Sequence, residues 1–209
     1  MAVVVVGGQT RNIGKTSVVA GLIARLPELH WSAFKITQYG HGFCTADGKP
    51  CQCQTEDACV AVNLERDPAS GTDTSRFLAA GAERSIWVRT RIGALSDAMP
   101  RVSQELARSE NAILESNSVL EFLTPDLYLT VFDPTVADFK ESARQFLDRA
   151  DALLLASDVV AAPEGRRRNL HPLSDKPTFP IAPPLYVSDD LVEFVRARLT
   201  RPAAQPTIV

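Results

Sequence analysis

The sequence predicts a three-layer α/β domain built on a mainly parallel central sheet. Two observations carry this prediction. Short apolar segments rich in β-branched residues alternate with helical segments along most of the 209 residues. The chain also begins with a valine-rich strand, a glycine-containing loop and an apolar helix, in that order. Because crossovers between parallel strands are right-handed, helices are expected on both faces of the sheet.

The individual elements follow from local patterns. Four successive valines flanked by glycine favour a first strand that is covered on both faces. The expected strands span residues 2–6, 31–37, 85–90, 111–115, 127–132, 152–156 and 185–187. The expected helices span residues 18–26, 74–82, 96–109, 136–150 and 190–199, with Thr72 or Asp73 capping the second and Ser188 or Asp189 capping the last.

Two stretches lack such patterns. Residues 40–71 gather Gly, Asp, Thr, Cys and Gln without periodicity, which predicts a long loop or insertion. Residues 163–184 are proline-rich and indicate a surface excursion. The chain is long enough to bury a sizeable core, so we expect one domain over residues 1–200 and a flexible tail at 201–209.

Composition excludes several classes of protein. The formal net charge is -3 with both signs interspersed, so the charge balance predicts binding to neither nucleic acid nor an anionic membrane. No apolar run approaches the roughly 20 residues that cross a bilayer. The N-terminus lacks a basic start followed by a cleavable apolar core, which makes the cytoplasm the expected compartment.

The first loop carries the chemistry of a phosphate site. Gly14 has no Cβ to keep the backbone from a phosphate, Lys15 can reach the β and γ oxygens, and Thr16 offers a hydroxyl to Mg²⁺. The N–H groups at the start of the following helix would face the same anion. We therefore predict a P-loop that binds Mg²⁺ and ATP or GTP, through Gly8, Asn12, Ile13, Gly14, Lys15, Thr16 and Ser17. A glycine-rich turn with an incidental lysine is the alternative.

The loop is longer than the common form, in which four residues separate the two glycines. Gln9 stands where the first glycine belongs, and Gly8 lies one residue earlier. This spacing resembles that of dethiobiotin synthetase and related amidotransferase-type synthetases. The segment around Lys35, at the end of the second expected strand, is also similar to the lysine-bearing segment of that family. The resemblance implies that Lys35 contacts a phosphate or an anionic acceptor; a solvated lysine is the alternative.

A second resemblance lies further along the chain. Asp73, Arg76 and the Ala80-Gly81-Ala82 turn resemble a pattern in molybdopterin-guanine dinucleotide biosynthesis protein B. That family also has a later strand ending in glutamate, where Glu115 stands here. Together the resemblances imply a P-loop NTPase fold, with Lys15, Lys35 and Glu115 as catalytic residues and Thr16, Asp73 and Glu115 as Mg²⁺ ligands. Alternatively, Asp73 only caps a helix and Glu115 only pairs with a basic side chain.

All four cysteines fall in the 40–71 stretch. They are Cys44, Cys51, Cys53 and Cys59. This clustering favours a Zn²⁺ site or an iron–sulfur cluster, in which His41 could replace one thiolate, over redox chemistry or unliganded thiols. The run Arg166 to Arg168 is typical of a solvated patch, or else of a clamp for an anionic substrate.

These observations predict a Mg²⁺-dependent nucleoside triphosphate-binding protein. We expect an NTPase, synthetase or kinase in cofactor biosynthesis, acting on a small molecule or cofactor-pathway partner that the sequence does not identify. The alternative is a nucleotide-switched metal-binding or cofactor-delivery protein that uses the cysteine loop. A scaffold without nucleotide binding is the third option, and a homodimer is left open.

Overall fold

The computed structural model of the chain describes residues 1–40, 60–133, 136–156 and 175–200. Its centre is an eight-stranded sheet in the order β3-β4-β2-β5-β1-β6-β7-β8. The strands are β1 (Val3–Gly8), β2 (Trp31–Tyr39), β3 (Val60–Glu65), β4 (Arg84–Arg91), β5 (Asn111–Glu115), β6 (Leu127–Phe132), β7 (Ala152–Ala156) and β8 (Thr178–Ile181). Only β3 runs antiparallel to its neighbour in this sheet, so the predicted mainly parallel sheet is confirmed.

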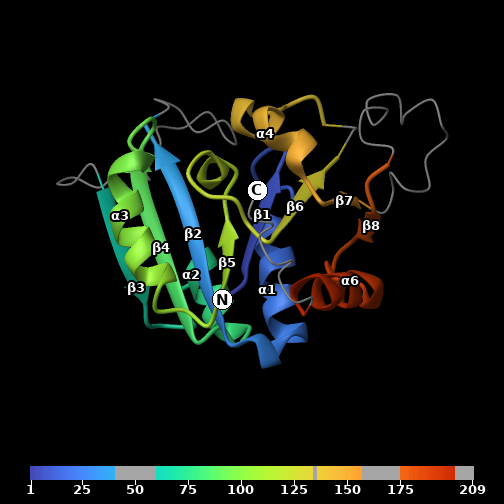
Figure 1. The fold of residues 1–209 in the computed structure, drawn as a ribbon, viewed down its shortest axis with the longest axis horizontal. Coiled ribbons are helices and arrows are strands. Elements are labelled where there is room, and N and C mark those ends of the chain that lie inside the picture. The colour runs from blue at the N-terminus through green and yellow to red at the C-terminus, as the bar shows by residue number, and fades with distance from the viewer. Residues whose placement is uncertain (41–59, 134–135, 157–174, 201–209) are drawn as a thin grey trace, which may run out of the picture.

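Helices cover both faces of the sheet (Figure 1). The α-helices are α1 (Lys15–Arg25), α2 (Asp73–Ala79), α3 (Leu95–Leu106), α4 (Glu141–Phe146) and α6 (Asp189–Leu199), and short 3₁₀ turns span Pro27–Leu29, Ser118–Glu121 and Leu147–Arg149. Buried side chains of α1, α2 and α6 pack on one face, and those of α3 and α4 pack on the other. The three-layer α/β architecture is therefore confirmed.

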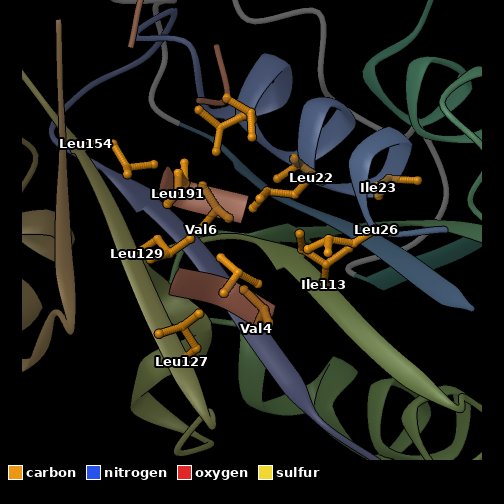
Figure 2. Close-up of a cluster of buried hydrophobic side chains, with 14 of the residues drawn as sticks. Val4, Val6, Leu22, Ile23, Leu26, Ile113, Leu127, Leu129, Leu154 and Leu191 are labelled. Carbon is orange, nitrogen blue, oxygen red and sulfur yellow. The ribbon is translucent and has the colours of Figure 1, made fainter. Parts of the chain in front are cut away.

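The first strand lies at the middle of the core. Val4 and Val6 pack under α1 and α6, as Figure 2 shows, whereas Val5 faces the α3 side. Val4 is in register with Ile113 on β5 and with Leu127 on β6. All three valines are fully buried, which confirms that this strand is covered on both faces.

The sequence reading was wrong at the two edges of the sheet. Strand β3 lies inside the predicted loop 40–71, and β8 lies inside the predicted surface excursion 163–184. Edge strands have one neighbour and half-exposed side chains, so neither has a continuous apolar run. Pro180 is tolerated in β8 because an edge strand can spare one N–H. Residues 185–187, predicted as a strand, are irregular: Leu185 is exposed and Val187 packs against α1.

The helix predicted over residues 136–150 is shorter. Lys140 has an extended backbone and its N–H donates to the carbonyl of Gln9 at 3.0 Å, so α4 begins only at Glu141. The segment before α4 is thereby tied to the first loop.

None of the helices in the described ranges combines the length and apolar character needed to cross a bilayer.

Glu65 organises the turn between β3 and α2. Its carboxylate accepts hydrogen bonds from the backbone N–H groups of Arg66 and Asp67 and from the hydroxyls of Ser70, Thr72 and Thr74, at 2.9 to 3.1 Å. The amide of Asp67 leads the donors that lower the pKa of Glu65 from 4.5 to about 2. Thr72 also caps α2 by accepting from the Ser75 N–H, so this turn fixes where Asp73 stands.

Replacement of Glu65 by Gln should therefore cost stability in a pH-dependent way. A carboxylate whose pKa is depressed by folding contributes stability above its unfolded value and loses it as pH falls through the folded value. The difference in unfolding free energy between wild type and Glu65→Gln should be largest above pH 4.5 and shrink toward about pH 2. Urea unfolding over a pH series measures it, and a difference independent of pH would contradict this role.

Candidate functional site

The predicted phosphate loop connects β1 to α1 at the carboxyl edge of the parallel strands (Figure 1). Gly14 is the residue before α1, with φ of 101°, a conformation that L side chains rarely adopt. A Cβ at this position would also lie 2.9 Å from Cε1 of Tyr186. Both constraints require glycine here, and at this position no side chain caps the first turn of α1. The strand, loop and helix form the P-loop unit that the sequence predicts.

Gln9, which replaces the usual first glycine, fastens the loop to β6. Its N–H donates to the carbonyl of Val131 at 2.9 Å and so extends the β1–β6 ladder by one bond. Its side-chain Oε1 accepts from the Asp133 N–H at 2.9 Å, and Nε2 donates to the carbonyl of Val136 at 2.7 Å. The side chain is 2% exposed. The extra residue of this long loop is therefore an anchor, and sequence reasoning missed that role.

Asn117 holds the other side of the loop. Its Oδ1 accepts from the Gly8 N–H and its Nδ2 donates to the Gly8 carbonyl, both at 2.8 Å. The amide sits so close to β1 that a Cβ on Gly7 would overlap its Oδ1. Asn117 was not predicted as a site residue, although a polar residue just past the carboxyl end of β5 is a signal that could have found it.

Lys15 lies under the loop and is largely buried. Its Nζ donates to the carbonyl of Thr10 at 2.6 Å. Burial lowers the pKa of Lys15 to about 8; the nearby Glu115 opposes that shift, whereas Lys140 and Lys35 add to it. Several ammonium groups thus converge on one loop, and their mutual repulsion would be relieved by an anion.

The strand ends beside the loop bring the other predicted residues together. Glu115, at the end of β5, is 3% exposed and accepts from Thr16 Oγ1 at 2.8 Å. Its other oxygen accepts from Lys35 Nζ, which also lies 2.9 Å from Asp73 Oδ2. The register places Val6, Glu115 and Lys35 in one row across β1, β5 and β2. The structure therefore places Thr16, Lys35, Asp73 and Glu115 in a single cluster.

The oxygens of this cluster suit Mg²⁺. Thr16, Asp73 and Glu115 supply a hydroxyl and two carboxylates, the ligand types that Mg²⁺ takes together with phosphate oxygens. A cation already lies where they converge, since the Lys35 ammonium contacts both carboxylates and lies 3.4 Å from Thr16 Oγ1. The three residues are thus arranged around a positive charge, and they fit the ion that the fold implies.

Two further polar residues, Asp138 and Lys140, contact the loop without having been predicted. Lys140 is half-buried, and burial, together with the nearby Arg11 and Lys35, lowers its pKa. Thr10 Oγ1 donates to Asp138 Oδ2, and Arg76 donates to Ser17 Oγ at 2.9 Å. A lone lysine and aspartate in an irregular segment give no sequence signal of this placement.

A hollow of about 320 Å³ adjoins the loop on the side of β6, β7 and β8. Thr10, Asn12, Ile13 and Tyr186 are among the residues that line it. The acidic cluster lies on the opposite side, toward β5 and β2. The loop is therefore bordered by the partly apolar hollow on the β6 side and by the charged cluster on the β5 side.

The remaining predicted residues lie outside the described ranges. They are His41, Cys44, Cys51, Cys53, Cys59, Arg166, Arg167 and Arg168. Within the described ranges, no group of three or more His, Cys, Asp or Glu residues is arranged to hold a metal ion by itself.

Comparison with family models and with curated proteins finds no match. Solved structures do match the fold. HypB from Helicobacter pylori, in complex with nickel, is 12% identical, with 93% of this chain and 86% of that chain covered and a TM-score of 0.49. LpxK from Aquifex aeolicus, in complex with ATP, is 17% identical at a TM-score of 0.47 over 86% of this chain, which spans 53% of LpxK. Bacillus subtilis MobB is 14% identical at a TM-score of 0.40, with 95% and 98% of the two chains covered.

The mainly parallel sheet, and the strand, loop and helix at the start of the chain, are as predicted. At these identities and TM-scores the likeness concerns the fold alone.

Asn117→Ala should weaken anion binding at the loop, because the Gly8 N–H and carbonyl lose their partners. Asn111, at the other end of β5, is a matched control: it also makes two hydrogen bonds to backbone groups, from the Ala2 N–H and to the Leu29 carbonyl, each 2.8 Å. Both alanine variants should lose about 1–3 kcal/mol in urea unfolding. Calorimetric titration with pyrophosphate should show weaker binding for Asn117→Ala alone; equal affinities in the two variants would contradict a specific role for Asn117.

Proposed function

We propose that the chain binds Mg²⁺ and a nucleoside triphosphate at residues 8–17 and transfers or hydrolyses the terminal phosphoryl group. One observation carries the proposal: Lys15 and the open start of α1 adjoin a cluster in which Thr16, Asp73 and Glu115 already surround a cation. Phosphoryl transfer needs positive charge and positioning more than covalent chemistry from the protein. This loop supplies both.

Each residue has a distinct task in that reaction. The N–H groups at the start of α1 and the Lys15 ammonium hold the phosphates. Thr16, Asp73 and Glu115 would hold Mg²⁺, which neutralises charge on the phosphate oxygens when bound. The hollow lined by Asn12, Ile13 and other loop residues adjoins the far side and receives the nucleoside, so the terminal phosphate would face β5 and β2.

The second reactant would meet the phosphate near Lys35. This residue lies in the middle of β2, level with Glu115 at the carboxyl end of β5 and beside both carboxylates of the cluster. Ligands gather at the carboxyl ends of strands in open parallel sheets. We infer an NTP-dependent synthetase, kinase or NTPase of cofactor biosynthesis, with Lys35 orienting a small acceptor. The motifs that resemble molybdopterin-guanine dinucleotide biosynthesis protein B and dethiobiotin synthetase support that class.

Lys15→Ala should abolish tight nucleotide binding. It removes the ammonium that faces the phosphates and leaves the first turn of α1 intact, since alanine is the best helix former. Calorimetric titration with ATP and with GTP, each with Mg²⁺, should give an affinity at least about tenfold weaker than that of wild type, a loss of about 1.4 kcal/mol. A Lys15→Ala protein that binds nucleotide as tightly as wild type would sink the proposal.

Lys35→Met should raise the affinity of the nucleotide-free protein for Mn²⁺, used as a spectroscopic substitute for Mg²⁺. The variant removes the ammonium that occupies the carboxylate cluster and leaves the buried Glu115 without its cation, which destabilises the fold. Electron paramagnetic resonance should show tighter Mn²⁺ binding, and Mn²⁺ should restore the lost thermal stability.

Lys140→Met is the control for this experiment. It deletes a half-buried ammonium near the same loop, but that ammonium has no hydrogen bond to Glu115 or Asp73 in the described structure. Equal Mn²⁺ affinities in Lys35→Met and wild type would show that the cluster is not the metal site.

A further inference from the structure

Beside Lys35, the face of the sheet that α2 covers carries polar and aromatic side chains, whereas the face that α3 covers is apolar. On β4, the side chains of Ile86 and Val88 are buried under α3, whereas Trp87 and Arg89 are half-buried on the α2 face. Helix α2 covers the start of this face, where Ser85 donates to the Thr74 carbonyl at 2.8 Å. Trp87 and Arg89 follow Ser85 toward the carboxyl edge, where Lys35 and Asp73 lie.

Trp87 and Arg89 are held in one arrangement by each other and by residues of the two neighbouring strands, β2 and β3. The Arg89 guanidinium lies over the Trp87 ring, 4.6 Å from its centroid. Arg89 Nη2 donates to Asn63 Oδ1 on β3 at 2.9 Å, and Trp87 Nε1 donates to Thr37 Oγ1 on β2 at 3.1 Å. An arginine that is stacked and hydrogen-bonded in this way loses little further freedom when it binds a ligand.

The positive charge of Arg89 is only partly compensated. Its Nη2 donates to a neutral amide, that of Asn63, and its Nε is buried without a hydrogen-bond partner in the described part of the chain. Arg84, at the other end of the same strand, pairs with Glu105 instead. A buried donor of a charged group is costly to leave unpaired, and a guanidinium edge matches the oxygens of a carboxylate or phosphate.

We propose that Arg89 and Trp87 form the binding site for an anionic group, carboxylate or phosphate, of the small molecule that reacts at Lys35. This inference rests on the proposed function, because it assigns the second substrate of the same site. Trp87 is in register with Lys35, and Arg89 is in register with Thr37, two residues further along β2. Two residues along a strand span roughly 6.6 Å, so one small molecule can reach both the reacting phosphate and Arg89.

The test uses full-length protein with excess Mg²⁺ and a non-hydrolysable triphosphate analogue, which keeps the phosphate loop filled. Inorganic phosphate and acetate serve as separate probes for the two anion types, and binding is followed by tryptophan fluorescence and by calorimetry. Arg89→Gln should weaken binding of the preferred anion about tenfold or more, since it removes a charge-assisted hydrogen bond. Arg89→Lys should recover only part of the affinity, and nucleotide affinity should remain that of wild type.

Arg91→Gln is the matched control, because it removes the same charge from the same face of β4 at an exposed position. It should bind anions like wild type. Trp87→Phe should lose the fluorescence change, and calorimetry should show weaker anion binding, with a smaller loss than in Arg89→Gln because Phe can still stack on the guanidinium. Equal anion affinity in Arg89→Gln and wild type, or an equal loss in Arg91→Gln, would overturn the assignment while leaving nucleotide binding intact. A wild-type protein that binds no nucleotide would overturn the proposed function, and the second-substrate role with it.

Discussion

The buried carboxylate of Glu115 is the constraint on which the rest of the site depends. An ionised carboxylate that is 3% exposed needs compensation, and here it receives a hydrogen bond from Thr16 and an ion pair from Lys35. These partners come from α1 and β2. They can meet because β5 lies between β1 and β2 in the sheet. Strand order, rather than any local motif, therefore assembles this cluster of Thr16, Lys35 and Glu115.

The loop between β1 and α1 is one residue longer than the common P-loop, and the additional residue has a structural role. Where shorter P-loops have glycine, Gln9 uses its backbone and side chain to bind β6 and the segment that follows it. That segment carries Asp138 and Lys140 back to the loop, through the Thr10 hydroxyl and the Gln9 carbonyl. The additional residue thus attaches a further charged segment to the loop between β1 and α1.

Sequence reasoning located the centre of the fold, and several residues that it assigned to a phosphate site lie together in the structure. Strands β5, β6 and β7 have the predicted bounds, because buried central strands are short uninterrupted apolar runs. Lys15 and Thr16 were proposed as site residues because they belong to a motif, and Glu115 because it ends an apolar run. Lys35 was proposed because it lies near the end of an expected strand, in a segment that resembles a known family. Strands β3 and β8 were missed, since an edge strand needs no apolar run. Gln9 and Asn117 act on backbone groups that are distant in sequence, and residue type alone does not reveal such contacts.

The two hydrogen bonds between Asn117 and Gly8 have a consequence for how accurately the site can work. Asn117 follows Glu115 by two residues, so the same short piece of backbone holds both the anchor of the phosphate loop and the buried carboxylate. The spacing between the loop anchor and the buried carboxylate is then set by two peptide bonds and does not depend on how the helices pack on the sheet. Motion of the outer strands, or substitutions in them, would therefore leave the spacing between Asn117 and Glu115 unchanged.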